Sequence, residues 1–258
     1  MSRRRRHSKE VAIRRFRPTL LPTLVVIILF PILVGLGFWQ LDRAKQKREI
    51  QAEYDARSQD ALVGIGPRLQ DADTLRFYRV TAKGSYNPDY QVLIDNRVQS
   101  GQVGYYVITP LRIPGSDMRV LVNRGWVPLG ASRQDLPKIE TPPALLTIEG
   151  VATVPSQDVF QLAEPPPLTG QWQIVWQHMD MKRYAEAVPF PVQPVVILLD
   201  PASPAGGFDR QWTRLDAGIA IHRGYAFQWF ILATALLVIW VVINLRKARQ
   251  VPDPSDQS

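Results

Sequence analysis

A single histidine stands at the start of the second of two long apolar segments, in the sequence I-H-R-G-Y-A-F-Q-W-F. An ionisable side chain at a membrane boundary commonly has a function, so His222 is the first candidate for chemistry. Helical spacing places His222, Tyr225, Ala226, Trp229 and Ala233 on one stripe, with an imidazole at its outer end. Imidazole is an axial ligand of haem iron, and apolar side chains contact the macrocycle. The stripe therefore indicates a possible haem site with His222 as the iron ligand.

Cations for the haem propionates are available on both apolar segments. Arg223 follows His222 directly, and the first segment ends in W-Q-L-D-R, which contributes Trp39 and Arg43. If both segments span the bilayer, these residues reach the same membrane face as His222. A second interpretation stays open, because His, Tyr and Trp gather at bilayer interfaces and a stripe of small and aromatic residues can simply pack against the other segment.

Most other chemistry is excluded by composition. The chain has no cysteine, which removes thiol redox chemistry, iron–sulfur clusters and cysteine-ligated zinc. Soft ligands for copper delivery are also scarce, with four methionines and three histidines in the whole chain. No nucleophile elbow, phosphate-binding loop or metalloprotease motif is present, so we expect no enzymatic activity. A membrane-anchored hydrolase or sensor would need a nucleophile–base pair that the sequence does not offer.

Two uncharged segments are long enough to cross a bilayer. Residues 18–41 and 222–245 are the expected transmembrane helices, since about 20 apolar residues span the roughly 30 Å hydrocarbon core. A cleaved signal would show a shorter apolar run and a small-residue cleavage site, so we expect the first segment to remain as an anchor.

The net charge of +8 is concentrated in the tails, residues 1–17 and 246–258, which leaves basic and acidic residues balanced between the two segments. This distribution is typical of a topology signal and predicts that both termini are cytoplasmic. It argues against nucleic acid as a partner and leaves membrane lipid as the expected one. Residues 42–221 would then face the periplasm or the mitochondrial intermembrane side.

The region between the segments is predicted to be β-rich. Residues 42–57 favour a charged helix that continues the first anchor. Short strand-type runs separated by turn residues then favour antiparallel strands in a barrel or sandwich, with one helix expected over residues 178–187. We interpret His178 as a residue at the start of this helix rather than as a ligand. The segment Asn123-Arg124-Gly125-Trp126 is interpreted as structural, with a partner-facing loop as the alternative. The expected strand-type runs are residues 76–81, 90–94, 105–111, 119–127 and 145–151.

Five pieces of the sequence, in order and with a span at each end, resemble the Surfeit locus protein 1 family of cytochrome c oxidase assembly factors. These pieces are G-F-W-Q-L-D-R-A-K-Q-K (37–47), R-F-Y-R-V-T-A-K-G-S-Y (76–86), G-Y-Y-V-I-T-P-L (104–111), V-L-V-N-R-G-W-V-P (120–128) and H-R-G-Y-A-F-Q-W-F (222–230).

The resemblance implies a role in building haem-copper oxidases by binding or delivering haem A for insertion into the catalytic subunit. It implies haem A synthase and that subunit as partners, and His222 as the proposed axial ligand. Members often carry Asn-Asn before this histidine, whereas Ala220-Ile221 precede it here, which leaves open what orients the second ring nitrogen. The alternative is a membrane-tethered scaffold for oxidase subunits that never contacts haem. Without a recognisable transit peptide, we expect a bacterial inner membrane.

Overall fold

The computed structural model describes residues 14–130, 132–133, 135–156, 172–212 and 218–247. The chain divides into two compact units. One unit comprises residues 1–49 and 216–258, and the other comprises residues 50–215. The first contains most of helix α1 (Leu20–Arg57) together with helix α4 (Ile219–Asn244), and the second contains the β-sheet.

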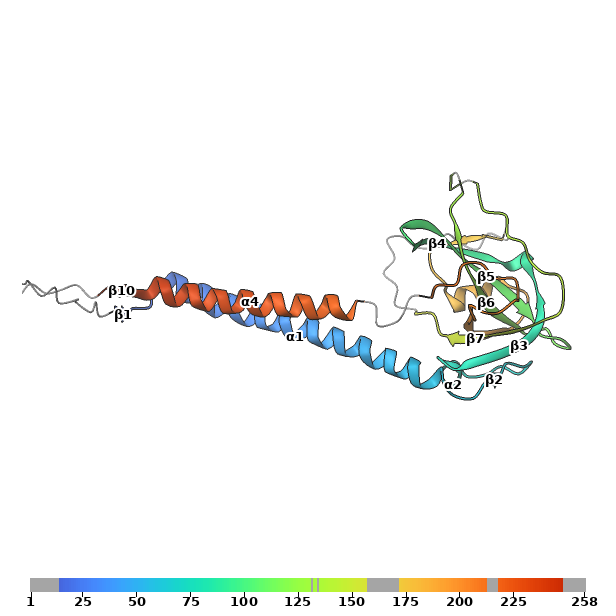
Figure 1. The fold of residues 1–258 in the computed structure, drawn as a ribbon, viewed down its shortest axis with the longest axis horizontal. Helices are drawn as coiled ribbons and strands as arrows, with labels where there is room; N and C mark the ends of the chain where they lie inside the picture. The colour runs from blue at the N-terminus through green and yellow to red at the C-terminus, as the bar shows by residue number, and fades with distance from the viewer. Residues whose placement is uncertain (1–13, 131, 134, 157–171, 213–217, 248–258) are drawn as a thin grey trace, which may run out of the picture. The chain divides into compact units, whose positions relative to one another are not determined.

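Helices α1 and α4 lie side by side and run in opposite directions (Figure 1). Both are long and apolar enough to cross a membrane. Their outward side chains are large and apolar, as in Leu24, Ile28 and Val238, which is what a lipid solvent favours. The short strands β1 (Arg14–Phe16) and β10 (Leu245–Lys247) pair antiparallel, so the chain enters and leaves the helix pair at the same end.

Small residues bring the two helices into close contact. A Cβ added to Gly37 would lie 2.6 Å from the Phe230 ring, so any larger residue there would displace this ring from its place between α1 and α4. Phe38 packs edge-on against the same Phe230 ring, with 5.4 Å between ring centroids. Ala226 and Ala233 of α4 are each only 2% exposed. Van der Waals packing of small residues against rings therefore holds this part of the pair together.

Polar side chains join the helices at the end near β1 and β10. The Asn244 side-chain oxygen, on a side chain that is fully buried, accepts hydrogen bonds from the Thr19 backbone N–H (2.7 Å) and hydroxyl (3.0 Å). One turn further in, the Trp240 indole N–H donates to the Thr23 hydroxyl at 3.0 Å. The first of these bonds satisfies the backbone N–H that directly precedes α1, and together the three bonds fix the register of the pair.

The second unit is built around a closed β-barrel. Strands β3, β7, β9, β6 and β5 form a ring, which the β3–β5 pairing closes. Strand β4 pairs with β5 outside the ring, β8 with β4, and β2 with β3. The elements are β2 (Val63–Gly64), α2 (Ala72–Leu75), β3 (Arg79–Tyr86), η1 (Pro88–Tyr90), β4 (Val92–Gln99), β5 (Gln102–Arg112), β6 (Arg119–Pro128), β7 (Leu146–Thr153), β8 (Val175–Trp176), α3 (Met181–Ala187) and β9 (Val192–Leu199).

Alternating burial along β3 and β7 produces the barrel core, whereas β6 is buried along almost its whole length. The inward side chains of β3, β7 and β9 include Val80, Ile148 and Ile197, all with no exposed surface. A second cluster on the other side of β6 contains Tyr184 and Trp176. Because β6 has core on both faces, its buried positions are nearly continuous and do not alternate with exposed ones, although they include the polar residues Asn123 and Arg124.

The expected fold class, two apolar helices flanking a β-rich domain, is confirmed, but details differ. Three pairings are parallel (β2–β3, β4–β8 and β6–β9), so the sheet is mixed rather than purely antiparallel. Strand β9 was not among the expected strands. The expected helix over 178–187 begins only at Met181, because the Asp180 carboxylate caps it by accepting the Arg183 N–H at 3.0 Å. His178 therefore lies before the helix.

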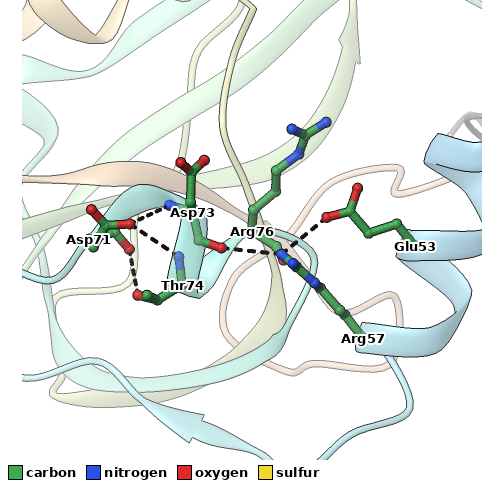
Figure 2. Close-up of polar contacts among 6 residues, drawn as sticks. All are labelled: Glu53, Arg57, Asp71, Asp73, Thr74 and Arg76. Atoms are coloured by element: carbon green, nitrogen blue, oxygen red, sulfur yellow. Dashed lines mark hydrogen bonds and ion pairs between the residues drawn. The ribbon is translucent and has the colours of Figure 1, made fainter. Parts of the chain in front are cut away.

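The last turns of α1 belong to the barrel unit and are fixed there by Arg57. Its Nη1 donates to the carbonyl oxygens of Asp73 and Arg76, both at 3.1 Å, and lies 3.2 Å from the Glu53 carboxylate (Figure 2). Asp73 lies in α2 and Arg76 directly follows it, and the N-terminus of α2 is capped by the Asp71 carboxylate. The C-terminal end of α1 is thus hydrogen-bonded to the region of α2 in the β domain. The expected helix over residues 42–57 is observed as the last part of α1.

The close contact at Gly37 gives a matched pair of glycine variants. Gly37→Leu should push Phe230 away and change the α1–α4 spacing. Gly35→Leu should leave the spacing unchanged, because a Cβ there meets nothing within 4 Å. Spin labels on cysteines introduced at the exposed positions Leu24 and Val238 report the spacing without interference, since the chain has no cysteine of its own. Equal distance distributions for both glycine variants would contradict the packing described here.

Candidate cofactor site at the start of α4

His222 lies in the first turn of α4 and faces α1. Its backbone N–H donates to the Gly218 carbonyl at 3.1 Å, and Gly218 adopts the left-handed conformation (φ 93°) that precedes the helix. The imidazole Nδ1 lies 2.8 Å from Oε1 of Gln40 on α1. His222 is therefore the polar contact between the helices at the end opposite Asn244.

The Gln40 contact decides which ring nitrogen of His222 is available. An amide oxygen only accepts hydrogen bonds, so Nδ1 must carry the proton and donate it. In the neutral ring, Nε2 then has the free lone pair. Within the described residues, nothing bonds to His222 Nε2. The ring thus presents an unoccupied nitrogen donor whose tautomer is set by the other helix.

The other members of the predicted stripe do not share one environment. Ala226 and Ala233 are buried in the helix pair, Trp229 is half-buried, and Tyr225 is 49% exposed. The alanines thus behave as the packing interpretation expects, whereas Tyr225 is open to the surroundings near the histidine. One face of the helix serves both for packing and for an exposed aromatic side chain.

The candidate cations lie apart from the imidazole. On α1, the Arg43 guanidinium lies 5.8 Å from the Trp39 ring centroid, and its Nη1 donates to the Gln46 side chain at 2.9 Å. Trp39 is 50% exposed. Arg223 on α4 is exposed as well. In the described part of the chain, the structure brings His222 together with Gln40, and Trp39 with Arg43, but no hydrogen bond joins either arginine to His222.

Gln40 is the site residue that sequence reasoning missed. It lies in the quoted piece G-F-W-Q-L-D-R, beside two residues that were considered. The available signal was a neutral amide near the end of an otherwise apolar span, a position where amides commonly bond across helices. Finding its partner required the register of α1 against α4, which the sequence does not state.

The segment Asn123-Arg124-Gly125-Trp126 is buried. The Trp126 indole donates to the Arg97 carbonyl at 2.8 Å, and the Asn123 side chain accepts from the Gly125 N–H at 3.1 Å. Arg124 is 1% exposed. These contacts agree with the structural interpretation rather than with a partner-facing loop.

Resident metal sites built from several protein ligands are absent from the described residues, since no group of three or more His, Asp or Glu side chains gathers there. A single free imidazole nitrogen suits a ligand that brings its own metal and needs one axial donor, as haem does.

These features define a class of protein: a β-barrel inserted between two apolar helices, with a lone oriented histidine where one helix begins. The two helices indicate a membrane protein. The SURF1 family matches residues 27–234, and the chain belongs to this family, whose members are known in general as oxidase assembly factors. The resemblance found in the sequence is therefore confirmed.

Relatives are found in bacteria and in animals. A SURF1-like protein of Rickettsia felis is 29% identical over 233 residues, which cover 85% of this chain and 95% of the relative. A SURF1-like protein of Caenorhabditis elegans is 24% identical, and the match covers 84% of this chain and 72% of the relative. The rat Surfeit locus protein 1 is 23% identical, and the match covers 80% of this chain and 70% of the relative. The similarity thus spans the helices and the barrel.

The tautomer of His222 can be measured without any cofactor. In the haem-free protein in detergent, ¹⁵N spectra should show Nδ1 protonated and Nε2 unprotonated, and Gln40→Leu should convert this into a mixture of tautomers. The chain has three histidines, so His222→Ala identifies the signals, and those of His178 serve as the unchanged control. A proton on Nε2 in the unaltered protein would contradict the hydrogen bond described here.

Proposed function

We propose that this protein is an assembly factor for haem-copper (cytochrome c) oxidase that binds or delivers haem A for insertion into the catalytic subunit, and that His222 Nε2 is the axial ligand. The observation that carries the proposal is the pairing of His222 Nδ1 with Gln40 at 2.8 Å, which leaves the second nitrogen without a partner among the described residues. A metal-ligating histidine almost always donates its other N–H in this way.

The residues near His222 suit a large apolar cargo. Tyr225, Trp39 and Ile221 are about half exposed or more, and they offer aromatic and aliphatic contact area to a macrocycle. Arg223 and Arg43 would supply cations for carboxylate groups at the membrane surface. The cargo itself brings the iron that accepts the imidazole nitrogen.

Release of the cargo is as important as its capture. Among the described residues of the helix unit, His222 is the only histidine. A single neutral imidazole binds less firmly than two axial ligands would, so a carrier of this kind can pass its cargo on. Haem A synthase as donor and the oxidase catalytic subunit as acceptor complete the proposal, and the β-barrel is the surface on which they would dock.

The proposed location is a bacterial inner membrane that the chain crosses twice, with both termini in the cytoplasm. Support comes from the basic tails and from the β1–β10 pairing, which puts both chain ends at one end of the helix pair. The SURF1-like relatives from Rickettsia species agree with a bacterial setting.

A scaffold that holds oxidase subunits without contacting haem is the second candidate. The observation in its favour is the burial of Ala226 and Ala233, which assigns part of the histidine stripe to helix packing. In that case the Gln40–His222 bond would only join the two helices.

Haem retention separates the two candidates. Protein purified from membranes that make haem A should show a Soret band, and His222→Ala should reduce it about tenfold because the axial donor is lost. Gln40→Leu should weaken binding by a similar order, since it removes the partner that orients the ring. His178→Ala, in the barrel unit, is the matched control and should retain full absorbance. Equal haem content in all four proteins, or none in the unaltered one, would favour the scaffold.

Topology is tested with reporter fusions in a bacterial host. An alkaline phosphatase fused after residue 258 should be inactive and a green fluorescent protein should be bright, because the basic tails hold both termini in the cytoplasm. Phosphatase inserted into the exposed β4–β5 turn at Ser100-Gly101 should be active. The reverse pattern would exclude the proposed orientation.

A further inference from the structure

Arg124 carries a buried positive charge in the barrel wall. Its side chain lies on β6, and the residue is 1% exposed. The guanidinium donates to the carbonyl oxygens of Gly206 (2.8 Å) and Glu140 (2.5 Å) and to the hydroxyls of Thr141 (2.9 Å) and Thr109 (3.5 Å). All four acceptors are neutral, so hydrogen bonding is nearly complete while the charge has no counter-charge.

Aromatic rings, not carboxylates, complete the surroundings of this guanidinium. It lies over the rings of Tyr86 and Phe208, at 4.8 and 4.9 Å from their centroids. Burial raises the pKa of Tyr86 to about 12, against the effect of Arg124 and Arg210, so the phenol stays neutral. Burial also lowers the pKa of Arg124, yet an arginine stays protonated at neutral pH. No carboxylate of the described residues forms an ion pair with Arg124.

A pocket of about 330 Å³ opens beside this charge. Gly206 adopts a left-handed conformation (φ 68°), and a Cβ there would collide with Pro142 and approach Arg124 Nη2 to 3.4 Å, so glycine keeps this wall open. The lining residues are Arg124, Glu140, Thr141, Pro142, Gly206, Gly207 and Phe208.

The pocket is rich in unused hydrogen-bond donors. Arg124 Nη2 retains one N–H, because the Glu140 carbonyl is its only acceptor in the part of the chain that the structure describes. The Thr141 hydroxyl accepts from Arg124 and keeps its own hydrogen, and the Gly207 N–H has no acceptor among the described residues. The Arg210 guanidinium lies against Gly207, and its Nη1 donates to the carbonyls of Asp200 and Ser203.

Structural cross-linking alone does not explain a charge at this position. A neutral glutamine could join β6 to the two loops without the cost of burying a cation, which is several kcal/mol for an unpaired ion before dipoles and rings offset part of it. A buried cation beside an open, donor-lined pocket is the arrangement expected where an anion completes the site. The Glu140 side chain is exposed at the rim, and its carbonyl is the group that bonds to Arg124.

We propose that this pocket binds a carboxylate group, with Arg124 as the cation of its lining, Arg210 as a second cation next to the lining residue Gly207, and Thr141 and Gly207 as neutral donors. A planar carboxylate accepts in-plane hydrogen bonds from a guanidinium, and one carboxylate compensates one buried charge. The carboxylate belongs either to a small organic acid or to an acidic side chain of a docking polypeptide. The proposal is independent of haem binding at His222.

Ligand-dependent stability of the full-length protein in detergent tests the proposal. Thermal unfolding is followed by tryptophan fluorescence in sodium glutarate and in sodium chloride of equal ionic strength. A ligand at ten times its Kd should raise Tm by about 3–6 °C beyond the effect of chloride, and the rise should saturate. N-acetyl-glutamate amide is a second probe that distinguishes the two sources. A larger Tm shift with this probe than with glutarate at equal concentration identifies an acidic side chain, and a larger shift with glutarate identifies a small organic acid.

Charge-neutral variants locate the site. Arg124→Gln should abolish the glutarate shift, and Arg210→Gln, at a less buried position, should weaken it at least fivefold even if the first variant fails to fold. Arg79→Gln, at an exposed position of β3, removes one positive charge outside the pocket and should keep the full glutarate shift. The proposal is overturned if glutarate acts no differently from chloride, if Arg210→Gln keeps the unaltered shift, or if inorganic phosphate stabilises the protein and glutarate does not.

Discussion

The register of α1 against α4 is the constraint on which the candidate site depends. Polar contacts join the helices at both ends, Thr19 with Asn244 and Gln40 with His222, and small residues such as Gly37 bring the backbones together between them. Thr19 and Gln40 are 21 positions apart and His222 and Asn244 are 22 apart, so each interval rises about 32 Å. This matches the roughly 30 Å hydrocarbon core, where unpaired polar groups are costly. The two polar contacts are thus about one hydrocarbon thickness apart along the helices, and the packing contacts lie between them.

The same register determines the chemistry of the histidine. Displacing α4 by one residue relative to α1 would rotate His222 by about 100° away from Gln40. Neither ring nitrogen would then have a hydrogen-bond partner that fixes the tautomer. With the register fixed, the Gln40 amide oxygen holds the proton on Nδ1, and Nε2 faces no competing donor among the described residues. Orientation of a lone imidazole therefore depends on helix packing, and residues far along the span, including Phe230 and Asn244, act on the site through it.

Much of the fold could be predicted from the sequence, because long apolar runs and strand-turn patterns are local signals. The two helices, the extension of α1 to Arg57 and five of the ring and edge strands were found in this way. Strand β9 was missed because it is a short, mostly apolar segment that contains Pro194 and does not alternate between apolar and polar residues. Its parallel pairing with β6 is also non-local, so no nearby turn residues indicate it. His222 could be singled out by its type and position, but Gln40 could not, since its role depends on a partner 182 residues away.

Two arginines of the barrel unit show how charge separates a structural contact from a binding site. Arg57 and Arg124 both bond to backbone carbonyls of loops and both lie over a tyrosine ring. Arg57 has the Glu53 carboxylate at 3.2 Å, and its side chain is 32% exposed, so its charge is compensated by an ion pair and by water (Figure 2). Arg124 has no such ion pair among the described residues and is 1% exposed, although its hydrogen bonds are more numerous. Because hydrogen bonds to neutral oxygens satisfy geometry but only partly offset a buried charge, the difference between the two residues lies in the missing anion, and the pocket beside Arg124 has the space for it.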